Sequence, residues 1–301
     1  MCPIDSTTYT GHNMVFIVGA PRSGTTWLQR LLATHPRIRT GQESKLFRWY
    51  IAPQLRMWTM ETTRELNPET ANGRGGTGLS CYFREEEFVS VLKQYLWLLM
   101  QPMIGPLRSG ELFVDKTPSH ALCISEIKRL LPQSRIIHIL RDPRDVVASL
   151  LAVSRSWGAA WAPKRATTAA ALWVDHVTAV RSVARGLPVR EFHEVTYERL
   201  SESPEETLTR VCEFLELDWH PDDVRRAVEA NRPHRGFATA IPLYGEAAER
   251  VGAFVREPQG FVRMATPGCW RTELSLLQKV AVWRVCRRLM LDLGYRTSIF
   301  A

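Results

Sequence analysis

The chain has 301 residues, 45% hydrophobic and 23% charged, which allows one large α/β domain or two small ones with a substantial buried core. A net charge of +8 suits an anionic ligand, but no dense lysine and arginine tract with interleaved aromatics indicates binding to nucleic acid. The six cysteines have neither a Cys-x-x-Cys pair nor zinc spacing, so we expect reduced thiols and no metal site.

Targeting and membrane segments are also not indicated. Residues 1–13 lack the basic and apolar regions of a signal peptide, and apolar runs such as 95–100 are far too short to span a bilayer. We therefore expect a cytoplasmic protein without an integral membrane segment, present as a monomer or a homodimer.

The first predicted elements are a strand at 15–18 and a helix that begins at Trp27. They are joined by Gly19-Ala20-Pro21-Arg22-Ser23-Gly24-Thr25-Thr26. Backbone N–H groups at such a turn, together with the helix dipole, are typical of a site for a phosphate-like anion. The glycine spacing matches the Walker A loop, G-x-x-x-x-G-K-[ST], but Thr25 stands where that loop has lysine and the cation has moved back to Arg22.

The rest of the chain alternates between strand and helix patterns. Such alternation favours a parallel sheet covered on both faces, with the ligand at the carboxyl ends of the strands. A short segment at 38–43 returns to the sheet, and the glycines of 67–80 indicate a mobile loop. Further strands are predicted at 112–114, 135–140 and 192–196, and helices at 85–100, 121–131, 144–154, 167–185, 204–215 and 273–293.

We expect one α/β domain over residues 1–301, of the P-loop type, with a central parallel sheet flanked by helices. Helical and loop insertions would form a lid over the bound substrate. The segment 231–267 is the predicted lid, because it holds several helix breakers and aromatics without strong periodicity.

The run Pro21-Arg22-Ser23-Gly24-Thr25-Thr26-Trp27 resembles the 5′-phosphosulfate loop of sulfotransferases that use 3′-phosphoadenosine 5′-phosphosulfate (PAPS). Arg22 matches the branch that includes bacterial, Golgi carbohydrate and tyrosylprotein enzymes. The resemblance implies that residues 19–27 hold the 5′-phosphosulfate and that Trp27 contacts adenine. It also implies PAPS as sulfuryl donor, 3′-phosphoadenosine 5′-phosphate (PAP) as product, and no required metal.

The stretch 141–149 resembles the 3′-phosphate site of the same family, in which the residues matching Arg141 and Ser149 bind that phosphate. On the residues alone, Ser149 could equally bond back to the preceding helical turn. Asp142 could be a helix cap and arginine partner or a Walker B magnesium ligand, and without a Walker A lysine we favour the cap.

Two later segments extend the resemblance. Tyr197 lies in a segment like the family's Tyr-Glu-Asp-Leu, where the tyrosine reaches the adenosine, although Arg199 replaces the usual aspartate. The run Gly268-Cys269-Trp270-Arg271 is similar to the C-terminal Gly-x-Trp-Arg loop, which closes over the 3′-phosphate and adenine. The resemblance therefore assigns Gly268, Trp270 and Arg271 to donor binding.

The resemblance also implies catalytic roles. Arg22 would bridge the sulfuryl and leaving oxygens, and Lys116 matches the lysine that meets the sulfuryl group. The acceptor hydroxyl needs a base within hydrogen-bond reach. Glu43 matches the base of the bacterial and tyrosylprotein branches, and His120, one turn beyond Lys116, is its rival.

Sulfuryl transfer from PAPS to a hydroxyl of a small-molecule, lipid or glycoside acceptor is thus the leading hypothesis. Aromatic stretches at 47–58, 82–88 and 237–254 are expected to form the acceptor wall. A P-loop nucleotide kinase and a catalytically silent nucleotide-binding module are the alternatives.

Overall fold

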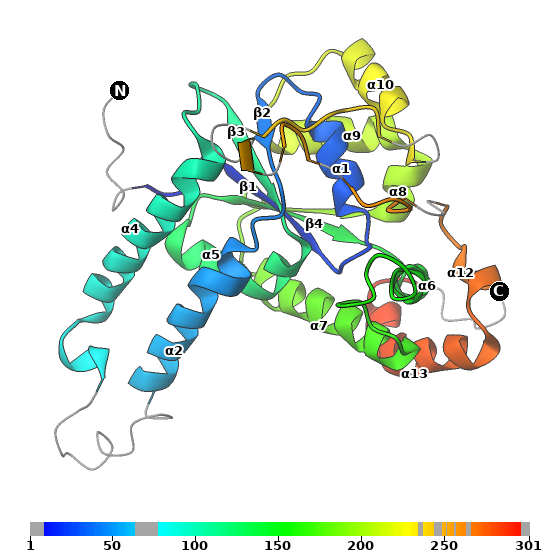
Figure 1. Cartoon of the computed structure of the whole chain (residues 1–301), viewed down its shortest axis with the longest axis horizontal. Helices are drawn as coiled ribbons and strands as arrows, with labels where there is room; N and C mark the ends of the chain where they lie inside the picture. Colours follow the sequence, from blue (N-terminus) through cyan, green and yellow to red (C-terminus); the bar gives the residue numbers. More distant parts are fainter. Residues whose placement is uncertain are drawn as a thin grey trace.

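The computed structural model describes residues 9–63, 78–233, 237–243, 249–250, 252–255, 257–262 and 266–295. Its centre is a five-stranded parallel sheet in the order β2-β3-β1-β4-β5 (Figure 1). This confirms the predicted α/β class. The strands are β1 (Met14–Gly19), β2 (Ile38–Thr40), β3 (Leu112–Lys116), β4 (Arg135–Leu140) and β5 (Phe192–Thr196).

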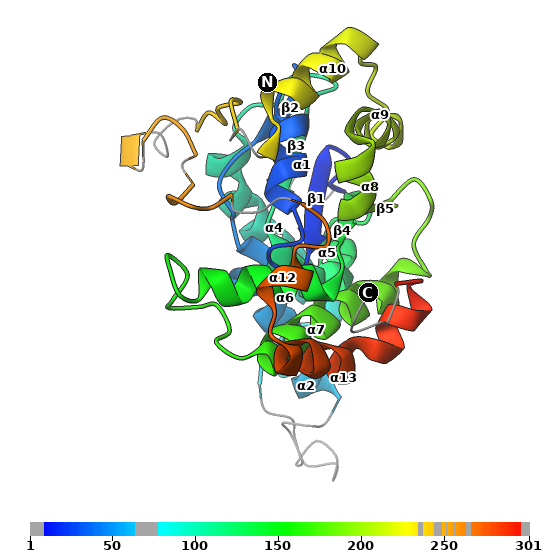
Figure 2. The same cartoon turned by 90° about the vertical axis from the view of Figure 1, so that its right-hand side faces the viewer.

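Helices connect these strands and cover both faces of the sheet. In Figure 1, α1, α8 and α9 lie on one side of the sheet and α7 and α13 on the other, and Figure 2 shows α7 and α13 below β1 and β4. The helices are α1 (Thr25–Leu32), α2 (Ala52–Thr62), α4 (Glu85–Ile104), α5 (Ile124–Leu130), α6 (Pro143–Val153), α7 (Ala166–Ala184), α8 (Tyr197–Glu202), α9 (Pro204–Phe214), α10 (Pro221–Ala230), α12 (Trp270–Glu273) and α13 (Leu276–Asp292). Shorter turns are the π-helix η1 (Phe47–Ile51) and the 3-10 helices η2 (Leu79–Cys81) and η3 (Pro118–Cys123).

The alternation of side chains along β1 builds two layers of core. Val15 and Ile17 pack with Trp27 and Leu28 of α1, whereas Phe16 and Val18 pack with Phe47 of η1. Because strand side chains point to opposite faces in turn, a strand covered by helices on both faces is apolar at every position. All six residues of β1 are buried, as the continuous apolar run predicts.

Several boundaries differ from those predicted. The helix expected at 121–131 is split into η3 and α5, with Pro118 in the first turn of η3. The last helix begins at Leu276 instead of Glu273, because Ser275 and Gln278 form a reciprocal capping box that fixes its start. Helix α10 was not predicted.

Two expectations concern segments only partly described. The glycine-rich loop at 67–80 lies mostly outside the described residues, as does part of the lid at 231–267. The described part of that lid contains one isolated antiparallel bridge, between Pro242 and Phe254. Across the described residues, no helix is long and apolar enough to cross a membrane.

Candidate functional site

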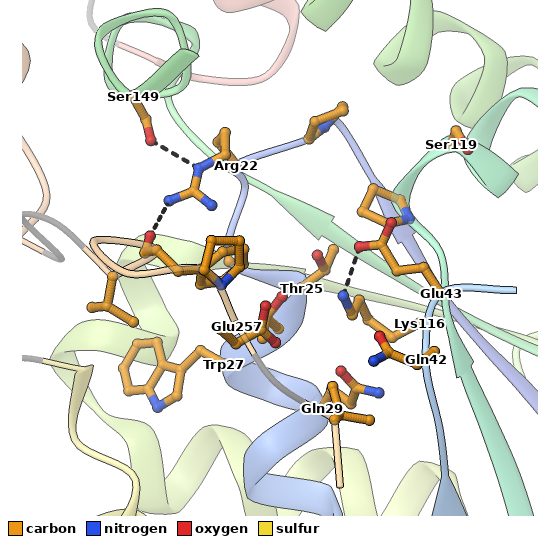
Figure 3. Close-up of a pocket in the computed structure, with 18 of the residues that line it drawn as sticks. Arg22, Thr25, Trp27, Gln29, Gln42, Glu43, Lys116, Ser119, Ser149 and Glu257 are labelled. Atoms are coloured by element: carbon orange, nitrogen blue, oxygen red, sulfur yellow. Dashed lines mark hydrogen bonds and ion pairs between the residues drawn. The ribbon is translucent and has the colours of Figure 1, made fainter. Parts of the chain in front are cut away.

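A cavity of about 640 Å³ opens at the carboxyl ends of the strands (Figure 3). It is bounded by the turn between β1 and α1, by the segments that follow β2 and β3, and by α6 after β4. Parallel strands place their carboxyl ends at one edge, so residues far apart in sequence meet there. Of the predicted site residues, Pro21, Arg22, Gly24, Thr25, Thr26, Trp27, Glu43, Lys116, Arg141, Ser149 and Tyr197 line it.

The turn from β1 into α1 is held close to Tyr197. Gly24 has φ of 101°, and a Cβ there would lie 2.4 Å from the Tyr197 ring, so both the backbone and the space require glycine. The amides of Thr25 and Thr26 lie at the start of α1, before the first helical hydrogen bonds, in which Trp27 and Leu28 donate to the Gly24 carbonyl at 3.0 and 3.3 Å. The Ser23 hydroxyl and the Trp27 indole N–H are buried without a hydrogen-bond partner among the residues that the structure describes.

Arg22 lies on the β4 side of the cavity. Its backbone is left-handed, with φ of 75°. Its Nε donates to the Ser149 hydroxyl at 3.0 Å and its Nη2 donates to the Phe261 carbonyl at 2.7 Å (Figure 3). The guanidinium also lies over the rings of Phe261 and Trp157, at 4.6 and 5.6 Å from their centroids. The structure thus brings Arg22 together with Ser149.

Lys116 and Glu43 form an ion pair on the opposite side of the cavity, with 2.7 Å between Nζ and Oε1 (Figure 3). Lys116 ends β3 and its side chain is 5% exposed, while Glu43 follows β2 and is 38% exposed. Glu43 is therefore accessible to a ligand while one of its oxygens is oriented by a buried cation.

His120 lies in the core and does not line the cavity. Its Nε2 accepts the Phe47 backbone N–H at 3.2 Å, and its Nδ1 lies 3.7 Å from the Asp115 carboxylate. The ring makes edge contacts with Phe16 and Phe47. Burial lowers the pKa of His120, which keeps the imidazole neutral. With Nε2 engaged and the ring fully buried, His120 does not line the cavity, and its role as the rival base stays a prediction.

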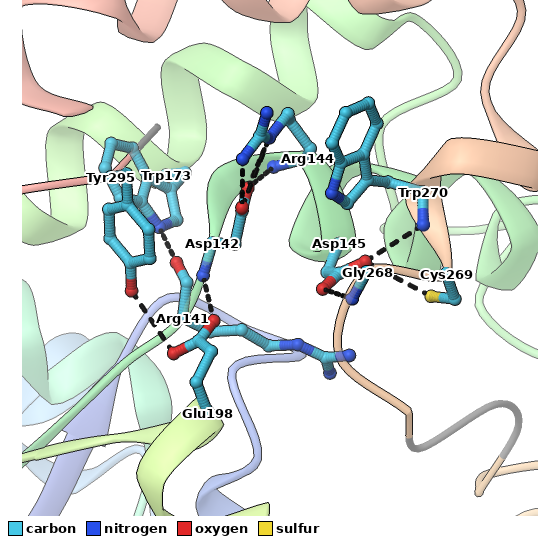
Figure 4. Close-up of polar contacts among 10 residues, drawn as sticks. All are labelled: Arg141, Asp142, Arg144, Asp145, Trp173, Glu198, Gly268, Cys269, Trp270 and Tyr295. Atoms are coloured by element: carbon cyan, nitrogen blue, oxygen red, sulfur yellow. Dashed lines mark hydrogen bonds and ion pairs between the residues drawn. The ribbon is translucent and has the colours of Figure 1, made fainter. Parts of the chain in front are cut away.

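Arg141 and Asp142 are fixed at the start of α6. The Arg141 guanidinium lies over the Tyr197 ring at 3.9 Å and donates to the Arg22 carbonyl at 3.3 Å, while its Nε is buried without a partner. Asp142 caps α6 by accepting the Arg144 N–H at 2.8 Å, and it pairs with the Arg144 guanidinium at 2.6 Å (Figure 4). Asp142 is thus the cap and arginine partner that the sequence favoured.

Glu198 supports the same loop from below. Its Oε1 accepts the Asp142 N–H at 2.8 Å, and its Oε2 accepts the Tyr295 hydroxyl at 3.4 Å (Figure 4). Burial raises the pKa of this carboxyl. The sequence identified Glu198 only as part of a motif, because its partners come from two distant segments.

The loop that precedes α12 is attached to α6 and lies outside the cavity wall. Asp145 accepts the backbone N–H groups of Gly268 and Trp270, and Trp270 is buried beneath the Arg144 guanidinium at 4.0 Å (Figure 4). Arg271 is exposed, and its guanidinium lies 4.8 Å from the centroid of the Trp270 ring. None of Gly268, Trp270 and Arg271 lines the cavity.

The expected acceptor wall is only partly correct. Trp49 lines the cavity, but Trp58 is buried and stacks on Phe88 at 4.2 Å, and no residue of 82–88 reaches the cavity. Helices α2 and α4 project away from the sheet, which carries 82–88 with them (Figure 1). Arg48 and Phe237, from the predicted stretches 47–58 and 237–254, also line the cavity, together with Lys45, Trp157 and Trp161, which the sequence did not single out. Within the described ranges, no group of three or more His, Cys, Asp or Glu side chains could hold a metal ion.

The fold and the cavity define an α/β protein of the P-loop type, in which a glycine-containing turn after the first strand lines the cavity. A family model described as the sulfotransferase family matches residues 14–221. The chain therefore belongs to the sulfotransferase family. The matched region contains the turn between β1 and α1, the Glu43–Lys116 pair, the start of α6 and Tyr197, and it ends before Gly268.

Individual relatives agree with this family. Protein-tyrosine sulfotransferase A of Caenorhabditis elegans is 24% identical over 216 residues, and the nodulation protein NoeE of Sinorhizobium fredii is 27% identical over 225 residues. These matches cover 68% and 67% of this chain, and they span half of the length of each relative.

Solved structures share the fold. The mouse sulfotransferase SULT7A1 complexed with PAP has a TM-score of 0.59 at 14% identity, covering 96% of this chain and 89% of that one. The sulfotransferase domain of the Synechococcus PCC 7002 olefin synthase has a TM-score of 0.55 at 19% identity, covering 94% and 96%.

Proposed function

We propose that this protein transfers the sulfuryl group of PAPS to a hydroxyl group of an acceptor. One observation carries the proposal: a single cavity joins the Gly24–Trp27 turn, the Arg141 and Ser149 side chains, and the Glu43–Lys116 ion pair. The first two sets suit two phosphate groups of one nucleotide. The third suits proton removal from a hydroxyl beside a cation.

The cavity's polar groups fit such a donor. The first-turn amides of α1 and the Ser23 hydroxyl suit the 5′-phosphosulfate, and Arg141 with Ser149 suits the 3′-phosphate. The buried Trp27 indole N–H and the Tyr197 ring offer a polar and an aromatic contact for the adenosine. When bound, the donor supplies the sulfuryl group and a phosphate leaving group.

Glu43 is assigned as the base and Lys116 as the cation that stabilises charge on the transferred group. Glu43 is partly exposed to the cavity and can accept a proton from an acceptor hydroxyl placed beside it. Lys116 pairs with Glu43, so protonation of Glu43 weakens the ion pair. The Lys116 ammonium then stabilises the negative charge that develops on the sulfuryl oxygens. Arg22 is assigned to the leaving phosphate, on the Ser149 side. Gly268, Trp270 and Arg271 are assigned to closing the loop over the donor.

The test separates this function from a nucleotide kinase and from a silent binding module. Affinities for PAP, for ADP and for ATP with magnesium are measured by calorimetry, and transfer of radiolabelled sulfuryl from PAPS is screened over phenols, alcohols, lipids and glycosides. We expect PAP to bind most tightly without metal and at least one acceptor class to be labelled. Preference for ATP with magnesium identifies a kinase, and tight PAP binding without transfer identifies a silent module.

A further inference from the structure

Two basic side chains at the acceptor end of the cavity have no acidic partner. Lys45 and Arg48 both line the cavity within five residues of Glu43, and within the described ranges neither forms an ion pair with a carboxylate. The Lys45 ammonium lies 4.4 Å from the centroid of the Trp49 ring. Both basic side chains are half-buried, so each has lost part of its hydration without gaining a counter-charge.

The carboxylates of the cavity wall are already engaged elsewhere. Glu43 pairs with Lys116 at 2.7 Å, and Glu257 lies 3.4 Å from the buried Arg30 guanidinium. They are the only two acidic residues among the described lining residues. The described lining residues therefore provide no carboxylate that pairs with Lys45 or Arg48.

The topology separates these cations from those assigned to the donor. Lys45 and Arg48 follow β2, whereas Arg141 and Ser149 follow β4. In the order β2-β3-β1-β4, three strand spacings lie between these two positions, roughly 14 Å. A nucleotide held by Arg141 and Ser149 thus approaches Lys45 and Arg48 only with its sulfuryl end, and Lys116 lies at that point.

The backbone that carries the two cations is unusual. Lys45 has a left-handed backbone with φ of 52°, and Arg48 lies in the π-helix η1. Left-handed non-glycine residues and π-helical turns both cost conformational energy and occur frequently at functional sites. Here they turn the chain so that Lys45, Arg48 and Trp49 all reach the cavity, and Trp49 keeps 58% of its surface exposed.

We propose that the acceptor is a small anionic hydroxyl compound. Its hydroxyl meets Glu43, and a carboxylate, phosphate or sulfate group a few bonds away pairs with Lys45 and Arg48. Its apolar or ring portion packs on the exposed face of Trp49. The inference rests on the proposed sulfuryl transfer, because the position of the hydroxyl beside Glu43 comes from it.

Matched acceptors test the charge requirement. We compare 4-hydroxyphenylacetate with 4-hydroxyphenylacetamide, and 6-hydroxyhexanoate with its amide, by kcat/KM with PAPS and by equilibrium binding to PAP-saturated protein. Within each pair the hydroxyl is the same and only the charge differs. We expect the carboxylate to be favoured at least tenfold over the amide in kcat/KM or in affinity.

Variants then connect the preference to the two cations. Lys45→Met/Arg48→Met should reduce the carboxylate-to-amide ratio to about one, and Lys45→Glu/Arg48→Glu should make tyramine a better ligand than 4-hydroxyphenylacetate. The double variant Arg284→Met/Arg288→Met removes the same charge from exposed positions on α13 and should keep the wild-type ratio. PAP affinity verifies that each variant is folded.

The outcomes distinguish the inference from the function on which it rests. A carboxylate-to-amide ratio near one in the wild type, a ratio unchanged by Lys45→Met/Arg48→Met, or no detectable binding of either carboxylate overturns the anionic acceptor. If the protein binds PAP and transfers sulfuryl to neutral acceptors only, the proposed function holds and the anionic acceptor is wrong. If the protein binds no PAP, the proposed function itself is wrong.

Discussion

The carboxylate of Asp145 accepts hydrogen bonds from the backbone N–H groups of Gly268 and Trp270, at 2.7 and 3.0 Å (Figure 4). The Cys269 thiol donates to the same carboxylate at 3.3 Å. Asp145 itself is 1% exposed and lies in the first turn of α6, next to the proposed 3′-phosphate site. A buried carboxylate that satisfies three donors fixes the loop before α12 at one position relative to Arg141.

The Asp145→Ala variant should therefore lose both stability and donor affinity. It leaves two buried amides unpaired, at a cost of about 2 to 3 kcal/mol in the free energy of unfolding. We expect PAP affinity to fall about tenfold, because Arg271 is no longer held near the start of α6. Urea unfolding and PAP calorimetry measure the two effects, with the exposed Asp175→Ala as control. Wild-type PAP affinity at the reduced stability would leave Asp145 with a purely structural role.

The Arg22→Ala variant should keep the fold and lose turnover by roughly a hundredfold or more, because it removes a charge used mainly in the transition state. Turnover and PAP affinity are measured together on the same preparation. Arg22→Lys, which keeps the charge but lacks the planar contact with Phe261, should lose less. Near-normal turnover of Arg22→Ala would contradict the assignment.

Arg141→Ala and Ser149→Ala should weaken binding selectively for nucleotides with a 3′-phosphate. The expected loss for the arginine is about 2 to 3 kcal/mol, as for a charge-assisted hydrogen bond. PAP and AMP affinities are compared in each variant. Ser154→Ala removes a hydroxyl just after the same helix, where it bonds only to the Leu151 carbonyl, and serves as control. Equal losses for both nucleotides would place the 3′-phosphate elsewhere.

Glu43→Gln and His120→Asn should affect different properties. The glutamine keeps shape and hydrogen bonding but cannot accept a proton, so kcat falls while donor affinity stays. A phenolic acceptor at high pH should recover more of the lost rate than an aliphatic alcohol. His120→Asn instead weakens the bond to the Phe47 N–H, and we expect a loss of about 1 to 3 kcal/mol in unfolding free energy with kcat retained. The reverse ordering in kcat would make the histidine the base.

Stability should fall as the pH decreases below the usual histidine range. Burial lowers the pKa of both His120 and His176 below the unfolded value of 6.5. The unfolded chain therefore binds protons that the folded chain does not, and folding stability is lost from pH 6.5 downward until the folded pKa is reached. Each such histidine contributes up to about 1.4 kcal/mol per pH unit. Unfolding in urea at pH 7.5, 6.5 and 5.5 measures the slope, which His120→Gln should reduce.

The sequence predicted the sheet because its signals are local. The strands at 135–140 and 192–196 have the predicted bounds, since each is a short segment between clear helix signals, and the first is largely apolar. The turn after β1 was also predictable, because a glycine at position 24 followed by threonines is typical of the backbone conformation that a phosphate site needs. Asp142 was predicted as a cap because the missing Walker A lysine disfavours the alternative role of magnesium ligand.

The tertiary structure decided which of the predicted side chains meet. Glu43 and His120 were rivals in sequence, and only packing placed Glu43 beside Lys116 and turned His120 into the core against Phe47. Arg22 lies with Ser149 because the turn after β1 and helix α6 meet at one edge of the sheet, where the Phe261 carbonyl accepts from the same guanidinium. Lys45 and Arg48 carried no motif, and their lack of acidic partners among the described residues emerges only from contacts between separate segments. Periodicity and turn chemistry depend on residues within one helix or strand, whereas charge pairing and burial depend on contacts between segments that sequence spacing does not reveal.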